Sequence, residues 1–294
     1  ESIPNAGNLA TLSSVDLDNG DITINAATSS TSSDSFLHSL YAPDKDVNIE
    51  MDLYGGKGTD ISSTDVGGDG GYSRIRFTMK QNEEYVIAGL TEAVKTPFVY
   101  HKASLIACVG GGGNAGTGGN GGSGGGIGVP GSTGIGAAAG TGAHTIIAGN
   151  LPSDGTFGSS FQSPTLYTGD TQASGSNGGS SIKCTKGVYW AQQGSAPCVD
   201  VAVSGKFRIS NGTEITNTAN IERGYKAGYN IIQTAGVGQN NGGNGGNGVV
   251  GGDGGGFNSG GGGASGYTDG SVTVVSTQQG GSTGNAKVVI RVVT

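Results

Sequence analysis

Hydrophobic and polar residues alternate with a period of two in several short stretches of this chain. In residues 72–80, Ile75, Phe77 and Met79 alternate with charged and polar residues, which predicts a strand with one buried face. Helical periodicity is almost absent. Comparable strand patterns occur in residues 47–55, 84–90, 98–109, 271–276 and 286–293. These stretches predict one β core that lies at the base of the molecule.

The last of these stretches differs from the others. Residues 286–293, AKVVIRVV, place Val288, Ile290 and Val292 on one face but are apolar on the opposite face as well. A strand of this kind has to be covered on both faces. We therefore expect cover from elsewhere in the chain or from another chain.

Glycine recurs at every third position in two runs. The first run has glycine at every third position from Gly110 to Gly134 without a break. The second run has it from Gly242 to Gly266, with Phe257 as the one exception. A left-handed extended helix has three residues per turn and no internal hydrogen bonds. Glycine at every third residue therefore lines one edge, where neighbouring helices approach and pair through their backbones. The residues expected on an outward edge are Asn114, Asn120, Asn244, Asn247 and Asp253.

Glycine at every third position has three other interpretations, the first of which does not fit the composition. Collagen also has glycine at every third position, but the whole chain holds 7 Pro, far fewer than a collagen helix needs. A disordered linker avoids the entropic cost of ordering glycine, which is roughly 0.5–1 kcal/mol per residue relative to alanine. A calcium-binding β-roll is indicated by residues 242–250, GGNGGNGVV, if Asn247 replaces the usual aspartate.

Charge and composition exclude several functions. The chain has 62 Gly, only 13% charged residues and a net charge of −7, which disfavours nucleic-acid binding. We find no apolar stretch of membrane-spanning length.

The phosphate-loop-like YGGKGT lacks the required Ser or Thr after Lys57. No nucleophile, base and orienting group can be assembled. The sequence predicts a protein that is not an enzyme and that holds no cofactor and no metal.

The three cysteines allow one pairing within a short loop. Cys184 and Cys198 bracket the segment TKGVYWAQQGSAP; they form either a disulfide or two reduced thiols in a hairpin. Cys108 lies in the apolar run SLIACV and is expected to be a small buried hydrophobic residue.

These patterns divide the chain into three parts. We expect a strand-rich N-terminal module in residues 1–48. A glycine-rich domain of β-structure and polyglycine helices is expected in residues 49–136 and 236–294. Residues 137–235 are then inserted loops with a small β insertion. The expected fold class is mostly β: an antiparallel scaffold, bundled polyglycine II-type helices, irregular loops and almost no α-helix.

The inserted part carries the predicted binding residues, because loops on a rigid scaffold often carry function. Aromatic faces pack against sugar rings or apolar receptor patches at low entropic cost. The alternative is that these rings fill a small local core. The candidates are Tyr189 and Trp190, supported by Phe157, Phe161 and Tyr167.

Two parts of the chain resemble the glycine-rich tail-fibre and adhesin proteins of bacteriophages, particularly those of marine cyanobacteria. The C-terminal GGGGASGYTDGSVTVVSTQQGGSTGNAKVVIRVV is similar to the ending of such proteins, and IPNAGNLATLSS…SLYAPDKDVNIEMDLYGGKG is similar to the module that precedes them. The stretch from DLYGGKG to LIACVGGGG resembles their glycine-rich domain. The resemblance covers roughly residues 2–125 and 236–294.

The resemblance implies an extracellular virion component at a fibre tip, in which loops bind the bacterial surface. The expected partners are a surface receptor (a glycan or an outer-membrane protein), other fibre or tail proteins, and further copies of the chain, as in a trimer. The alternative is a structural virion decoration or an extracellular filament subunit that binds no receptor. No binding residue carries over from the family.

Overall fold

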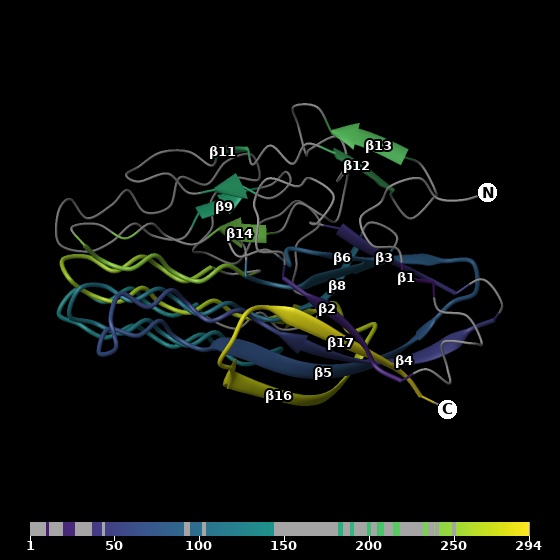
Figure 1. The fold of residues 1–294 in the computed structure, drawn as a ribbon, viewed down its shortest axis with the longest axis horizontal. Coiled ribbons are helices and arrows are strands. Elements are labelled where there is room, and N and C mark those ends of the chain that lie inside the picture. Colours follow the sequence, from purple (N-terminus) through teal and green to yellow (C-terminus); the bar gives the residue numbers. More distant parts are fainter. Residues whose placement is uncertain are drawn as a thin grey trace.

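The computed structural model describes residues 10–11, 20–26, 37–42, 45–90, 95–101, 104–143, 182–184, 189–190, 199–200, 205–208, 214–217, 232–234, 238, 241–248 and 251–293. In this part of the chain the fold is mostly β, with largely antiparallel sheets and no helix, as predicted. Two sheets lie at one end of the molecule, and long extended segments run from them toward the other end (Figure 1).

A six-stranded sheet and a five-stranded sheet form a sandwich. The six-stranded sheet has the order β1 (Ala10–Thr11), β3 (Leu37–Tyr41), β6 (Glu84–Ala88), β7 (Phe98–His101), β8 (Ser104–Cys108) and β15 (Tyr267–Thr268). The five-stranded sheet has the order β16 (Thr273–Ser282), β5 (Gly70–Met79), β4 (Val47–Tyr54), β17 (Lys287–Val292) and β2 (Ile22–Asn25).

Apolar side chains from both sheets make one core. Met51 and Ile75 of the five-stranded sheet lie in it with Ile87 and Val99 of the six-stranded sheet, all fully buried. The alternation predicted for residues 72–80 is confirmed, because Ile75 and Met79 are buried and Phe77 is partly buried against the core. The stretch 98–109 is not one strand, since β7 and β8 within it pair antiparallel as a hairpin.

Strands from the expected N-terminal module belong to the same two sheets. β3 pairs with β6, and β2 pairs with β17. The expected boundary at residue 48 therefore falls inside a sheet. The boundaries of the other two parts stay predictions.

The apolar strand β17 is covered within the described chain. It is not an edge strand, because it pairs with β4 on one side and β2 on the other. Val288 and Ile290 point into the core, and Val289 on the opposite face is also buried. Its apolar character therefore does not require another chain.

Buried residues also lie on the second face of the six-stranded sheet. Phe98 and Tyr100 of β7 point away from the main core and are buried, as are Cys108 and Tyr267. The prediction for Cys108 is confirmed, because its side chain is fully buried.

In the described residues, the glycine-rich stretches form extended segments beside the sandwich, which we call the glycine bundle (Figure 1). Their backbones hydrogen-bond to neighbouring segments, as the lateral-pairing argument predicted. The polyglycine II geometry of each segment stays a prediction. The segments are g1 (residues 55–60), g2 (65–71), g3 (110–117), g4 (119–127), g5 (129–135), g6 (138–143), g7 (241–248), g8 (251–256) and g9 (258–266).

Segment g9 is the centre of the bundle. The N–H groups of Gly260, Gly261 and Gly262 donate to carbonyl groups of g5, g3 and g8 at 2.9, 3.0 and 2.8 Å. The carbonyl groups of the same three residues accept from N–H groups of g6, g4 and g7 at 2.9, 2.7 and 2.8 Å. Three consecutive residues thus serve six different neighbours. This arrangement leaves room for no side chain, because a Cβ on any of the three would overlap a neighbouring carbonyl oxygen.

The five side chains expected on an outward edge of the glycine segments differ in exposure. Asn244 is exposed, and the other four residues expected on an outward edge are half-buried. Asn114, Asn120 and Asn244 also accept hydrogen bonds from backbone N–H groups of other parts of the chain. Asn114 Oδ1 accepts a hydrogen bond from Thr59 N at 2.9 Å, and Asn120 Oδ1 accepts one from Val66 N at 2.9 Å.

Candidate functional site

The turns at the far end of the glycine bundle make one continuous surface. Segment g1 leaves β4 and turns back at residues 61–65, and three other turns connect neighbouring segments at the same end (Figure 1). We call this end the tip surface; it comprises residues 61–65, 117–118, 135–138 and 257–258.

Large apolar side chains are exposed on the tip surface. Ile61, Ile135 and Phe257 are 53%, 60% and 63% exposed. Val275, on the edge strand β16, is the other large hydrophobic residue exposed in the described chain, at 44%. Exposed apolar groups that gather at one place mark interaction surfaces, whereas single ones are ordinary. Three such residues from three turns make the tip surface the strongest candidate.

Hydrogen bonds hold these turns to one another. Gly118 N donates to Asp65 Oδ1 at 3.1 Å, which joins the first two turns. Ala138 N donates to Ser259 Oγ at 3.0 Å, and that hydroxyl donates to Phe257 O at 3.0 Å, which joins the last two. Asp65 is the one charged residue in the four turns. The tip surface is therefore held together by hydrogen bonds, and it combines three large exposed apolar side chains with polar residues and one carboxylate.

Sequence reasoning missed the tip surface as a site. Its signal was present, since Phe257 is the single break in the second glycine phase. A large apolar side chain does not fit inside the bundle, because even an added Cβ would overlap the backbone of a neighbouring segment. The break therefore marks a turn that projects beyond the packed segments.

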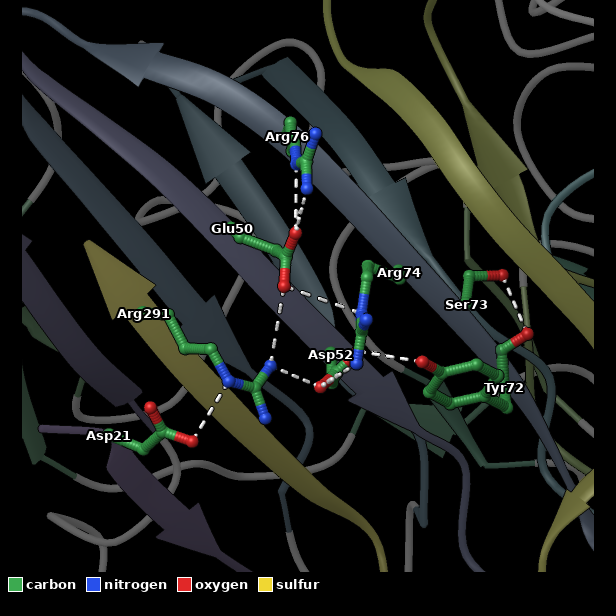
Figure 2. A network of polar contacts seen from close by, with 8 residues as sticks. All are labelled: Asp21, Glu50, Asp52, Tyr72, Ser73, Arg74, Arg76 and Arg291. Carbon is green, nitrogen blue, oxygen red and sulfur yellow. Dashed lines mark hydrogen bonds and ion pairs between the residues drawn. The ribbon is translucent and has the colours of Figure 1, made fainter. Parts of the chain in front are cut away.

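A second group of functional side chains lies on the outer face of the five-stranded sheet (Figure 2). Glu50 and Asp52 are two residues apart on β4, so both point outward while Met51 between them points into the core. Asp52 accepts hydrogen bonds from Arg74 Nε at 2.7 Å, from Tyr72 Oη at 2.7 Å and from Arg291. A fully buried carboxylate thus sits between two guanidinium groups and a phenol.

The neighbouring carboxylate extends this network. Glu50 pairs with Arg76 at 2.7 Å and lies 3.6 Å from the Arg291 guanidinium. Arg291 also pairs with Asp21 at 2.8 Å. Three arginines from β5 and β17 therefore face three carboxylates across the sheet, as Figure 2 shows.

The network shifts the protonation equilibria of its members. Burial raises the pKa of Asp52, but the hydrogen bonds from Arg74, Arg291 and Tyr72 outweigh it and lower that pKa to about 2. Burial and the hydrogen bond to Asp52 raise the pKa of Tyr72. Because the charged groups satisfy one another, the network suits a structural role on the sheet better than proton transfer to a substrate.

Most of the predicted binding residues lie outside the described residues, including Phe157, Phe161 and Tyr167. For Tyr189 and Trp190 the structure gives the backbone, which forms β10 (Tyr189–Trp190) paired with β11 (Val199–Asp200). Two further antiparallel pairs in the same part of the chain are β9 (Ile182–Cys184) with β14 (Ile232–Thr234), and β12 (Gly205–Arg208) with β13 (Glu214–Asn217). The aromatic site stays a prediction.

The predicted disulfide also stays untested. Cys184 ends β9, whereas Cys198 lies outside the described residues.

The calcium-binding alternative does not fit the glycine bundle. A β-roll stacks successive repeats in parallel, but g7 and g8 run antiparallel, with Gly252 N bonded to Gly246 O and Gly255 N to Gly243 O. Within the described ranges no three His, Cys, Asp or Glu residues are grouped so that they would hold a metal ion. The same residues include no helix that is long and apolar enough to span a membrane.

Comparison with known proteins gave no assignment. No protein-family model matches the chain, and no curated protein has a sequence similar enough to count as a match.

Proposed function

We propose that this protein is a phage virion fibre component that acts as a host-surface adhesin, with the tip surface as its contact with a receptor on the bacterial envelope. The observation that carries the proposal is the exposure of Ile61, Ile135 and Phe257 on three turns at the end of one hydrogen-bonded bundle. Such a surface loses little conformational entropy on binding, because its turns are already fixed.

The chemistry of the tip surface favours a partner with an apolar patch. Aliphatic and aromatic side chains supply the contact area, and polar uncharged residues such as Ser62 and Asn258 surround them. A strongly anionic partner is disfavoured, because these turns contain one carboxylate and no Lys or Arg. The resemblance to phage fibre proteins supports the bacterial envelope as the place of that partner.

The test is adsorption of labelled protein to a panel of bacteria that includes marine cyanobacteria. A triple variant, Ile61→Ser, Ile135→Ser and Phe257→Ser, removes the exposed apolar groups from the tip surface. Loss of one central apolar anchor typically costs about 2 kcal/mol or more, so we expect binding to fall at least roughly thirtyfold. The matched control is Val275→Ser, which removes an exposed apolar group from β16 instead.

Equal binding by the triple variant and the control would reject the tip surface as the contact. Circular dichroism and thermal melting establish that both variants fold.

A structural subunit is the second candidate, and the edge strand β16 favours it. This strand is ten residues long and carries no charged side chain, and among the strands of the described residues it pairs with β5 alone. Uncharged, exposed edge strands tend to associate with other chains. Concentration-dependent sedimentation that Val275→Lys abolishes, together with failure to adsorb to any cell, would favour a filament or decoration subunit.

A further inference from the structure

Asparagine followed by glycine is the dipeptide most prone to deamidation, because glycine has no side chain to hinder attack by its own nitrogen. Four such pairs lie in the described glycine bundle, at Asn120, Asn241, Asn244 and Asn247. The bundle gives each pair a different environment, so their reactivities have to differ even though the local sequence is the same.

Both reacting groups of the pair Asn120–Gly121 are engaged in hydrogen bonds to a neighbouring segment. Asn120 Oδ1 accepts from Val66 N at 2.9 Å, and Gly121 N donates to Val66 O at 2.9 Å. One residue of the neighbouring segment thus holds the electrophilic amide and the attacking nitrogen. The reaction at this pair requires local opening of the bundle.

Two further pairs are partly held. Asn244 Oδ1 accepts from Gly238 N at 2.8 Å. Asn247 is half-buried, and its carbonyl accepts from Thr96 Oγ1 at 2.7 Å and from Gly111 N at 2.9 Å. In both pairs the asparagine is therefore held by a hydrogen bond from another segment of the chain.

The pair Asn241–Gly242 is the exposed exception. Asn241 lies in a turn with φ of 64° and its side chain is exposed. Within the described ranges, neither that side chain nor the N–H of Gly242 makes a hydrogen bond to another residue. We propose that Asn241 is a site of spontaneous deamidation at the margin of the tip surface.

The reaction needs only water and a base from solvent. The nitrogen of Gly242 loses its proton to solvent and attacks Cγ of Asn241, so that a new C–N bond forms. The Cγ–Nδ2 bond breaks, and the amide nitrogen takes up one proton from solvent and leaves as ammonia. Water then opens the resulting succinimide to aspartate or isoaspartate, with no change of oxidation state.

Both products change the neighbourhood of the tip surface. Each adds a negative charge beside the turn at residues 117–118, where Thr117 N donates to Asn241 O at 3.0 Å. Isoaspartate also inserts its Cβ into the main chain. The extra backbone atom lengthens the chain at the start of g7, so that its residues no longer match the three-residue spacing of their partners in g3. This product is therefore expected to weaken the pairing of g7 with g3.

The test is incubation of the folded protein in mildly alkaline buffer, followed by peptide mass spectrometry. We expect the mass gain of an amide-to-acid exchange at Asn241, at least about tenfold faster than at Asn120, which corresponds to about 1.4 kcal/mol of opening free energy. In the unfolded chain the two sites should react at similar rates, because both precede glycine. Asn241→Asp serves as the standard for the aspartate product.

Similar rates at Asn241 and Asn120 in the folded protein would overturn the proposal. So would an unreactive Asn241 in the folded protein when the unfolded chain reacts there. Receptor binding is not part of the readout, so the result is independent of the proposed adhesin function.

Discussion

The β sandwich and the glycine bundle differ in what lies between neighbouring segments of chain. Between the two sheets lie apolar side chains such as Met51, Leu53 and Ile75, none of which is exposed. Between g9 and its six neighbours lie backbone hydrogen bonds, and no side chain separates the segments at Gly260–Gly262. The sandwich is thus stabilised mainly by removing apolar area from water, and the bundle by satisfying backbone groups laterally.

This difference means that the two regions tolerate opposite changes. A sandwich loses stability when side-chain volume is removed, because a cavity remains. The glycine bundle loses stability when volume is added, because the added atom meets a backbone carbonyl that has no rotamer to change. Substitutions in each region can test this contrast.

The largest expected effect is that of Leu53→Ala in the sandwich. Leu53 is fully buried in the core that both sheets share. We expect a loss of about 2–5 kcal/mol in the free energy of unfolding, the range for truncating a buried leucine. Urea unfolding followed by tryptophan fluorescence and circular dichroism measures it. The control is Val275→Ala on the exposed edge strand, and an equal loss there would contradict the assigned core.

The next effect in size is that of Gly262→Ala in the bundle. The new Cβ would overlap the carbonyl oxygen of Thr141, which belongs to g6. Overpacking of this kind costs typically about 1–3 kcal/mol. Gly284→Ala is the matched control, because an added Cβ there meets no atom within 4 Å. If both substitutions leave the unfolding curve unchanged, g9 is not the packed centre of the bundle.

The sandwich could be predicted from the sequence to a large extent. Alternation of Ile75 and Met79 with arginines identified a strand and its buried face, and both residues are in the core. The hairpin at residues 98–108 was harder, because its turn interrupts a nearly continuous apolar run. A period of two shows which side chains point inward. A turn of a few residues hardly alters that pattern, so the pattern does not show where one strand ends and the next begins.

The neighbours within the bundle could not be predicted in the same way. Backbone groups are alike at every glycine, so a period of three identifies extended segments without showing which segments pair. One signal does distinguish the interior. Four consecutive glycines occur at Gly110–Gly113 in g3 and at Gly260–Gly263 in g9, and g9 has six neighbours and g3 five. A segment surrounded on all sides needs glycine at every position of a turn.

The candidate site was less accessible to sequence reasoning than the fold. The aromatic residues singled out, Tyr189 and Trp190 among them, were chosen by residue type. Ile61, Ile135 and Phe257 lie on three turns that are far apart in the sequence but are found at the same end of the glycine bundle. Such convergence depends on segment length and pairing, which the glycine pattern does not specify.

Acid should affect the charged network of the sandwich through Asp52. Its pKa falls to about 2 in the folded protein from an ordinary value of 3.8. The ionised group therefore contributes about 2 kcal/mol to the free energy of unfolding above about pH 4. This contribution is lost as the pH falls through about 2. Urea unfolding at a series of pH values should show a smaller acid-induced loss in Asp52→Asn than in the wild type. Equal losses would mean that Asp52 is not held by Arg74 and Arg291.

The smallest expected effect concerns the side chains that bind the outer segments of the bundle. Asn120→Ala removes the acceptor of Val66 N and leaves that N–H without its partner. The expected loss is about 1 kcal/mol, the usual net value of one hydrogen bond, and hydrogen exchange at Val66 should accelerate. Asn120→Asp keeps the acceptor oxygen and should retain protection at Val66, whereas Asn244→Ala, on another segment, should not change it. If Asn120→Ala leaves exchange at Val66 as slow as in the wild type, backbone pairing alone holds g2, and the outward asparagines only face solvent.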